Sequence, residues 1–136
     1  MEVVEKKVAV MACNGLDRIL GTVARMAAYK VLDELRAEST VLLCPPALIA
    51  EVEEDVEFVR ENPVLVIEGC KHECGRKIVE KFDGEIGGIV RVDMHAEKSG
   101  LNPESMRELG SEGERLVELI AETAANEVDR IVGGAS

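Results

Sequence analysis

Tryptophan is absent from the chain, and its 136 residues include only one tyrosine and two phenylalanines. The hydrophobic core must therefore be built from valine, isoleucine, leucine, alanine and methionine. Short runs rich in valine and isoleucine are typical of strands buried in a parallel sheet. A chain of this length is expected to form a single α/β domain over residues 1–136, with enough core to fold without disulfide bonds.

Other absences exclude whole classes of function. No apolar run approaches the ~20 residues that cross a bilayer, so we expect no membrane partner. Basic residues are outnumbered 16 to 27, and the net charge of −11 would repel nucleic acid. No G-x-G-x-x-G or Walker pattern follows the first predicted strand, which argues against a nucleotide site. The first seven residues do not resemble a signal peptide, so we expect a cytoplasmic protein.

Strand and helix patterns alternate along the chain. Strand patterns occupy residues 8–12, 39–43, 64–67 and 86–92. Helical spacing of apolar residues predicts helices at 18–35, 45–60, 76–82 and 111–131, with a short helix in the connection 96–110. This alternation predicts a doubly wound, Rossmann- or flavodoxin-like α/β fold, a mainly parallel four-stranded sheet with helices on both faces. We prefer the strand order 2-1-3-4 over 3-2-1-4, because Cys13 and Cys70 then flank the switch point where ligands bind.

Three of the four cysteines come directly after predicted strands. Cys13 follows the first strand, Cys44 the second and Cys70 the third, while Cys74 lies one helical turn beyond Cys70. The carboxyl ends of parallel strands share one edge of the sheet, with neighbouring strands ~4.8 Å apart, so these sulfur atoms can approach one another. Cysteines in a cytoplasmic protein are more often metal ligands or reactive thiols than disulfides. We therefore predict a Zn²⁺ site formed by Cys13, Cys44, Cys70 and Cys74, and an iron–sulfur cluster is the alternative with the same ligands.

Four further side chains are candidates for a fourth ligand or for a hydrogen-bond partner of a ligand. They are His72, His95, Asp93 and Glu68. Cys44, between Leu43 and Pro45, is the cysteine whose surroundings best fit simple packing in the core. Without Cys44, a three-cysteine site would keep a position open for water or a substrate thiol.

The sequence leaves other functions open and does not decide whether the protein is an enzyme. Cys70 and Cys74 could form a disulfide relay with Cys13 as the resolving thiol. The spacing from Cys13 to Arg18 is similar to the C-x5-R phosphate loop of low-molecular-weight phosphatases, but it is one residue short. The protein could instead carry a metal ion or sulfur to a protein partner that binds its acidic surface.

The cysteine motifs resemble the DGC domain family, whose members are proposed to bind zinc. The family has C-[S/N]-G after the first strand, a cysteine after the second and D-G-C-x-x-x-C after the third. This chain has Cys13-Asn14-Gly15, Cys44-Pro45 and Glu68-Gly69-Cys70-Lys71-His72-Glu73-Cys74, and the resemblance covers residues 8–95. It implies a small α/β domain whose cysteines hold zinc. The chain departs from the family pattern by having Glu68 in place of aspartate and a shorter loop after Cys13.

Overall fold

The computed structural model describes residues 7–13 and 18–133. Its centre is a four-stranded sheet in the order β2-β1-β3-β4, in which all neighbouring strands are parallel. The strands are β1 (Val8–Ala12), β2 (Thr40–Leu42), β3 (Val64–Glu68) and β4 (Ile86–Arg91). The parallel pairing and the strand order confirm the prediction from the sequence, and β1 and β3 therefore flank the switch point of the sheet.

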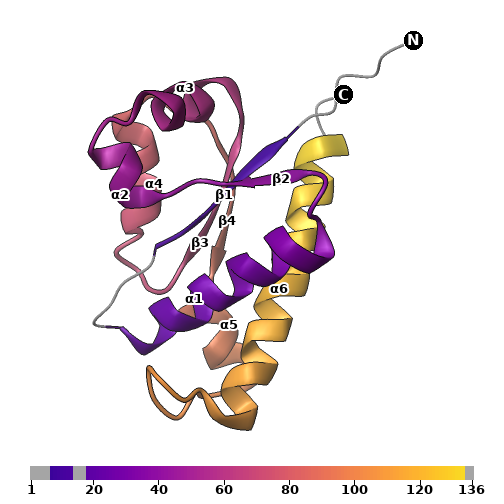
Figure 1. Cartoon of the computed structure of the whole chain (residues 1–136). Coiled ribbons are helices and arrows are strands. Elements are labelled where there is room, and N and C mark those ends of the chain that lie inside the picture. Colours follow the sequence, from indigo (N-terminus) through magenta and orange to yellow (C-terminus); the bar gives the residue numbers. More distant parts are fainter. Residues whose placement is uncertain (1–6, 14–17, 134–136) are drawn as a thin grey trace.

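Helices cover both faces of the sheet, as in a doubly wound α/β fold (Figure 1). They are α1 (Ile19–Lys30) with the π-helical turn η1 (Val31–Leu35), α2 (Pro45–Ile49), α3 (Glu53–Glu61), α4 (Cys74–Lys81), α5 (Val92–Ser99) and α6 (Gly110–Gly133). α1 and α6 pack against each other on one face, while α2, α3 and α4 lie on the other. Within the described part of the chain, no helix combines the length and the apolar character needed to span a membrane.

β1 separates two hydrophobic cores, because successive side chains of a strand point to opposite faces. Val8 and Val10 belong to the core shared with α1 and α6, whereas Ala9 and Met11 belong to the core beneath α2, α3 and α4. Every residue of β1 and β3 is buried. These two central strands are therefore held from both sides, and their carboxyl ends are fixed points from which the cysteine segments start.

The segment predicted as one helix from residue 45 to residue 60 forms two helices, so that prediction is wrong. Glu51 adopts a left-handed conformation (φ 60°) between α2 and α3, and Val52 is extended. α3 then begins with Glu53, Glu54 and Asp55, whose negative charges favour the positive end of a helix. These acidic residues therefore form the first turn of a second helix.

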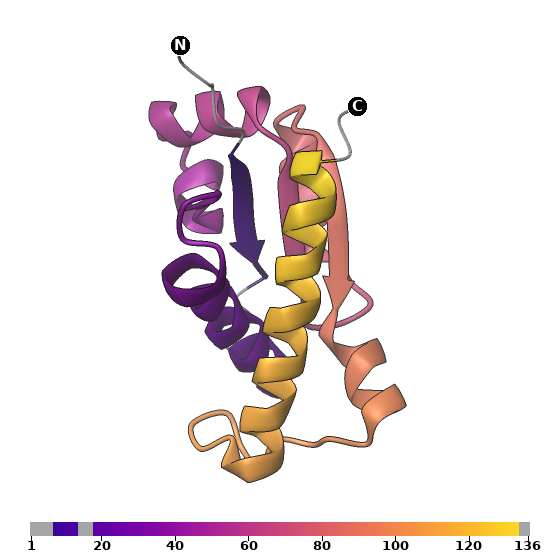
Figure 2. The ribbon, with the colours of Figure 1, turned by 90° about the vertical axis from the view of Figure 1, so that its right-hand side faces the viewer.

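The connection over residues 96–110 also differs from the prediction. β4 leads directly into α5 (Figure 2). Asp93 and His95 therefore lie on a helix. Gly100 follows α5 in the left-handed conformation (φ 76°), which is the usual way in which glycine ends a helix. Residues 100–109 form no helix, and α6 begins at Gly110. The helix expected inside this connection is therefore displaced to its beginning.

Candidate functional site

A pocket of about 210 Å³ lies at the carboxyl-terminal edge of the sheet, between the ends of β1 and β3 and the start of α4. Three of the four cysteines line this cysteine pocket: Cys13 after β1, Cys70 after β3 and Cys74 at the first position of α4. Its other lining residues are Arg18, Glu68, Gly69, His72 and Glu73. Because β1 and β3 are paired neighbours, the pocket lies at the switch point of the sheet.

Gly69 connects Cys13 to the segment that contains Cys70 and Cys74. Its backbone N–H donates a hydrogen bond to Cys13 Sγ at 3.2 Å. A Cβ atom on Gly69 would lie 3.1 Å from the backbone nitrogen of Gly21 in α1, which is closer than side chains normally allow. Glycine at position 69 therefore lets the end of β3 approach both the end of β1 and α1. This close approach brings Cys13 beside the loop that contains Cys70.

Glu68 provides a buried cap for α4. It is the last residue of β3, and only 1% of its surface is exposed. Its Oε1 accepts the backbone N–H of Gly75 at 3.2 Å, and its Oε2 accepts that of Arg76 at 2.8 Å. Burial raises the pKa of Glu68, and the two hydrogen bonds partly oppose this rise. These N–H groups belong to the first turn of a helix and have no partner within it, so the strand supplies the acceptors.

Glu73 holds the other end of the cysteine loop, residues 69–73, through ion pairs. It has a left-handed conformation (φ 47°), and its carboxylate accepts hydrogen bonds from Arg76 at 2.7 Å and Arg91 at 3.1 Å. Arg91 also binds both oxygens of Asp93, at 2.8 and 2.7 Å. The Arg76 guanidinium, helped by Arg91, lowers the pKa of Glu73, and Arg91 lowers the pKa of Asp93. The ion pairs therefore connect the end of β4 to the cysteine loop.

Of the other predicted ligands, Glu68 and His72 line the cysteine pocket, whereas Cys44, His95 and Asp93 do not. Cys44 lines a separate cavity of about 100 Å³ next to Tyr29 of α1. His95 lines another cavity beside β4, together with Lys98. Asp93 is paired with Arg91, which also pairs with Glu73 of the cysteine loop. Of the two histidines, only His72 is a lining residue of the pocket.

Comparison with protein-family models matches the DGC domain over residues 9–112. This chain belongs to the DGC domain family. The matched region contains every residue that lines the cysteine pocket. No curated protein and no solved structure matches the chain. The family predicted from the cysteine motifs is thus confirmed.

The side chains that line the cysteine pocket suit a metal ion that prefers sulfur ligands. Zinc takes cysteine sulfur and histidine nitrogen, and none of the four cysteines is in a disulfide. Among residues 7–13 and 18–133, no three His, Cys, Asp or Glu side chains are placed to hold one metal ion together. Coordination therefore requires the thiols of the pocket to turn toward a common point. Cys13 and Cys70 are half-buried and Cys74 is exposed, so none is packed tightly on all sides. The predicted ligand set stays a prediction.

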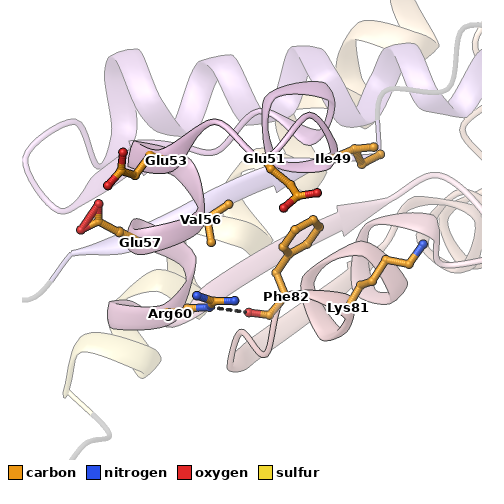
Figure 3. Close-up of a pocket in the computed structure, with 8 residues that line it drawn as sticks. All are labelled: Ile49, Glu51, Glu53, Val56, Glu57, Arg60, Lys81 and Phe82. Carbon is orange, nitrogen blue, oxygen red and sulfur yellow. Dashed lines mark hydrogen bonds between the residues drawn. The ribbon is translucent and has the colours of Figure 1, made fainter.

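A wider cavity, of about 720 Å³, lies between the α2–α3 corner and the end of α4 (Figure 3). Within the lining of this cavity, Arg60 Nε donates a hydrogen bond to the backbone oxygen of Phe82 at 3.3 Å. Its lining residues are Ile49, Glu51, Glu53, Val56, Glu57, Arg60, Lys81 and Phe82. The lining contains neither a thiol nor an imidazole and shares no residue with the cysteine pocket. This cavity supplies no ligand to the cysteine pocket.

Sequence reasoning missed Arg91 and Glu73 as organisers of the loop. These two residues are 18 positions apart in the sequence. They come together because β3, which leads into the cysteine loop, pairs with β4, which ends at Arg91. No local spacing indicates such a pair. The only signal was indirect, because an arginine at the end of β4 lies on the same sheet edge as the cysteine loop.

Proposed function

We propose that this DGC domain binds a zinc ion through Cys13, Cys70 and Cys74. The observation that carries the proposal is that three thiols, from the ends of two strands and the start of a helix, line one pocket and form no disulfide. Thiolates bind zinc at about 2.3 Å and are among its preferred ligands. The pocket lies where open α/β sheets place their ligands.

The fourth position is open to His72 or to an exchangeable ligand. His72 is the one imidazole on the pocket, and Cys44 lies in a different cavity. A site with three protein ligands and an exchangeable fourth position is the arrangement of catalytic zinc rather than of closed structural zinc. When bound, zinc would supply Lewis acidity, either to water or to a substrate thiol. The protein residues would supply the binding geometry and exclude part of the solvent.

Charge around the pocket is compatible with thiolate ligands. Three thiolates would carry one more negative charge than zinc neutralises. Arg18 lines the pocket, and Arg76 lies in the first turn of α4 with its guanidinium beside Glu73. The backbone N–H of Gly69 already points to Cys13 Sγ, and hydrogen bonds of this kind stabilise sulfur that carries negative charge.

Elemental analysis of protein purified anaerobically without added metal tests the proposal. We expect about one zinc ion per chain. Cys13→Ser, Cys70→Ser and Cys74→Ser should each lose most of it. Met11→Leu removes a fully buried sulfur from β1 at similar volume and should keep the metal. A wild-type protein that takes up no zinc even after reconstitution would contradict the proposal, and a brown protein containing iron and sulfide would identify an iron–sulfur cluster instead.

Thiol–disulfide chemistry is the second candidate, favoured by the hydrogen bond from Gly69 to Cys13 Sγ. In this case two of the pocket thiols would give two electrons and two protons to an external disulfide, which would be reduced to two thiols. Peptide mapping after incubation with glutathione disulfide would identify a reversible bond among Cys13, Cys70 and Cys74. A metal-free protein in which no such bond forms would exclude this candidate.

A further inference from the structure

Glu68 is an unusual choice of helix cap. Helices are normally capped by a Ser, Thr, Asp or Asn at the N-cap position. Here the N-cap residue is Glu73, whose side chain makes no capping hydrogen bond and instead binds Arg76 and Arg91. The N–H groups of Gly75 and Arg76 are bound by Glu68, from the strand before the loop. A buried carboxylate is costly unless it is hydrogen-bonded, and both oxygens of Glu68 find their donors in the first turn of α4.

The hydrogen bonds of Glu68 close the cysteine loop into a ring. They join the last residue of β3 to the first turn of α4, and Cys70 and Cys74 lie between the joined points. Gly75 permits this contact, because a Cβ atom there would lie 2.5 Å from Val66 Cγ1 and 3.3 Å from both carboxylate oxygens. The start of α4 is thus pressed against β3 at Gly75, the residue after Cys74.

We propose that Glu68 is the positioning residue of the metal site, which fixes the start of α4 so that Cys74 faces Cys70 and Cys13. This inference rests on the proposed zinc function. In this arrangement Glu68 acts through the backbone N–H groups of Gly75 and Arg76, which its two oxygens accept, and the cysteines are the ligands. Hydrogen-bonded partners that orient metal ligands typically change metal affinity by about 10–100-fold when they are removed.

Glu68→Gln tests the proposal, with Glu80→Gln as its matched control. Glutamine keeps the size of the side chain, but its NH₂ group would face a backbone N–H that needs an acceptor. Glu80 is an exposed residue of α4, and its side chain pairs with Arg76 instead of capping the helix. Zinc affinity, measured by competition with a chromogenic chelator, should fall about 10–100-fold in Glu68→Gln and stay unchanged in Glu80→Gln. The sulfur-to-cobalt absorption of the cobalt-loaded protein should change in Glu68→Gln only.

A role in stability alone would give a different result. It would lower the unfolding temperature of Glu68→Gln but leave the zinc affinity of the folded protein and the cobalt spectrum as in the wild type, and that outcome would overturn the proposal. If Glu68→Gln does not fold, Glu68→Asp takes its place, because a side chain one methylene shorter reaches the two N–H groups less well. Weaker zinc binding is expected for that variant too, and unchanged binding would again overturn the proposal.

Failure of the zinc function itself would be seen separately, as a wild-type protein that takes up neither zinc nor cobalt. The positioning of Cys74 by Glu68 is then tested in the metal-free protein. The measurement is the alkylation rate of Cys74 relative to that of Cys44, which lies in another cavity. We expect this ratio to change in Glu68→Gln and to be unchanged in Glu80→Gln. Equal ratios in all three proteins would show that Glu68 does not position Cys74.

Discussion

The cysteine pocket and the cavity of Cys44 lie at the same edge of the sheet, but their sulfur atoms have different neighbouring side chains. The cysteine pocket has about twice the volume, 210 against 100 Å³, and contains three thiols, an imidazole and charged groups. The cavity of Cys44 contains one thiol, and most of its other lining residues are apolar: Ala12, Ala28, Leu42, Leu43 and Pro45. A position after a parallel strand therefore brings a cysteine to the right edge, but not necessarily to the same site.

The register of β2 explains the difference. Leu42 lies opposite Val10, so Cys44 falls level with Ala12, one residue short of Cys13. Leu43 packs into the core beneath α2, α3 and α4, and Cys44 therefore turns toward α1, where it lies near Tyr29. β2 is also an edge strand, separated from β3 by β1. Cys44 is thus separated from the cysteine loop by a full strand.

The largest effect that we expect is in metal content and directly tests this comparison. Cys44→Ser should keep about one zinc per chain, whereas Cys70→Ser should lose it, because only Cys70 lines the cysteine pocket. Both changes replace a thiol by a hydroxyl at the same edge of the sheet, so each controls for the other. Loss of zinc from Cys44→Ser to the same extent would mean that β2 moves toward the pocket on binding and that all four cysteines are ligands.

The features that the sequence predicted correctly depend on local signals. The apolar runs of β1 and β3 are bounded by cysteine, glycine and proline, and their ends place Cys13 and Cys70 without knowledge of distant contacts. The strand order followed from the preference for those two cysteines at the switch point. The family could be identified from the same short motifs.

The features that were missed depend on register or on pairs distant in sequence. β2 has only three residues, so its alternation is too short to indicate on which face Cys44 lies. The break at Glu51 requires a left-handed glutamate, for which composition gives no signal. The hydrogen bonds of Glu68 to the start of α4 depend on how closely that helix approaches β3. Side-chain chemistry could be predicted from sequence, but the partner of each side chain could not.

Gly75→Ala should have the next largest effect, because the start of α4 at the cysteine pocket depends on the tight contact between Gly75 and β3. The added methyl group would meet Val66 Cγ1 at 2.5 Å, within the buried core. Such overpacking costs about 1–3 kcal/mol, to be measured by urea denaturation. The alkylation rate of Cys74 should also change, while that of Cys44 should not.

Gly133→Ala is the control for this substitution, since a Cβ atom there would meet nothing within 4 Å. It should leave both the stability and the two alkylation rates close to those of the wild type. If Gly75→Ala were as stable as Gly133→Ala, the start of α4 would not be pressed against β3. The difference between the two cysteine environments would then need another explanation.

The smallest effect concerns the ion pairs that hold the cysteine loop, and it depends on pH. Arg91 lowers the pKa of Asp93, and it adds to the larger effect of Arg76 in lowering the pKa of Glu73. These ion pairs therefore stabilise the fold at pH values above the usual pKa of a carboxyl group. This stabilisation is lost as the pH falls from that pKa through the lowered values in the folded protein. Arg91→Gln should therefore lower the melting temperature at neutral pH by about 1–3 °C, and this difference should vanish in acid.

Arg36→Gln provides the matched control, because Arg36 binds both oxygens of Asp129 at 2.7 Å and lowers the pKa of that carboxyl group. It should show the same dependence on pH, since the same kind of pair is broken. The two variants should differ in the thiols: Arg91→Gln loosens the cysteine loop and changes the alkylation of Cys70 and Cys74, whereas Arg36→Gln does not. If both variants left those rates unchanged, the loop would be held by Glu68 and Gly69 alone, and the ion pairs would stabilise the fold without shaping the site.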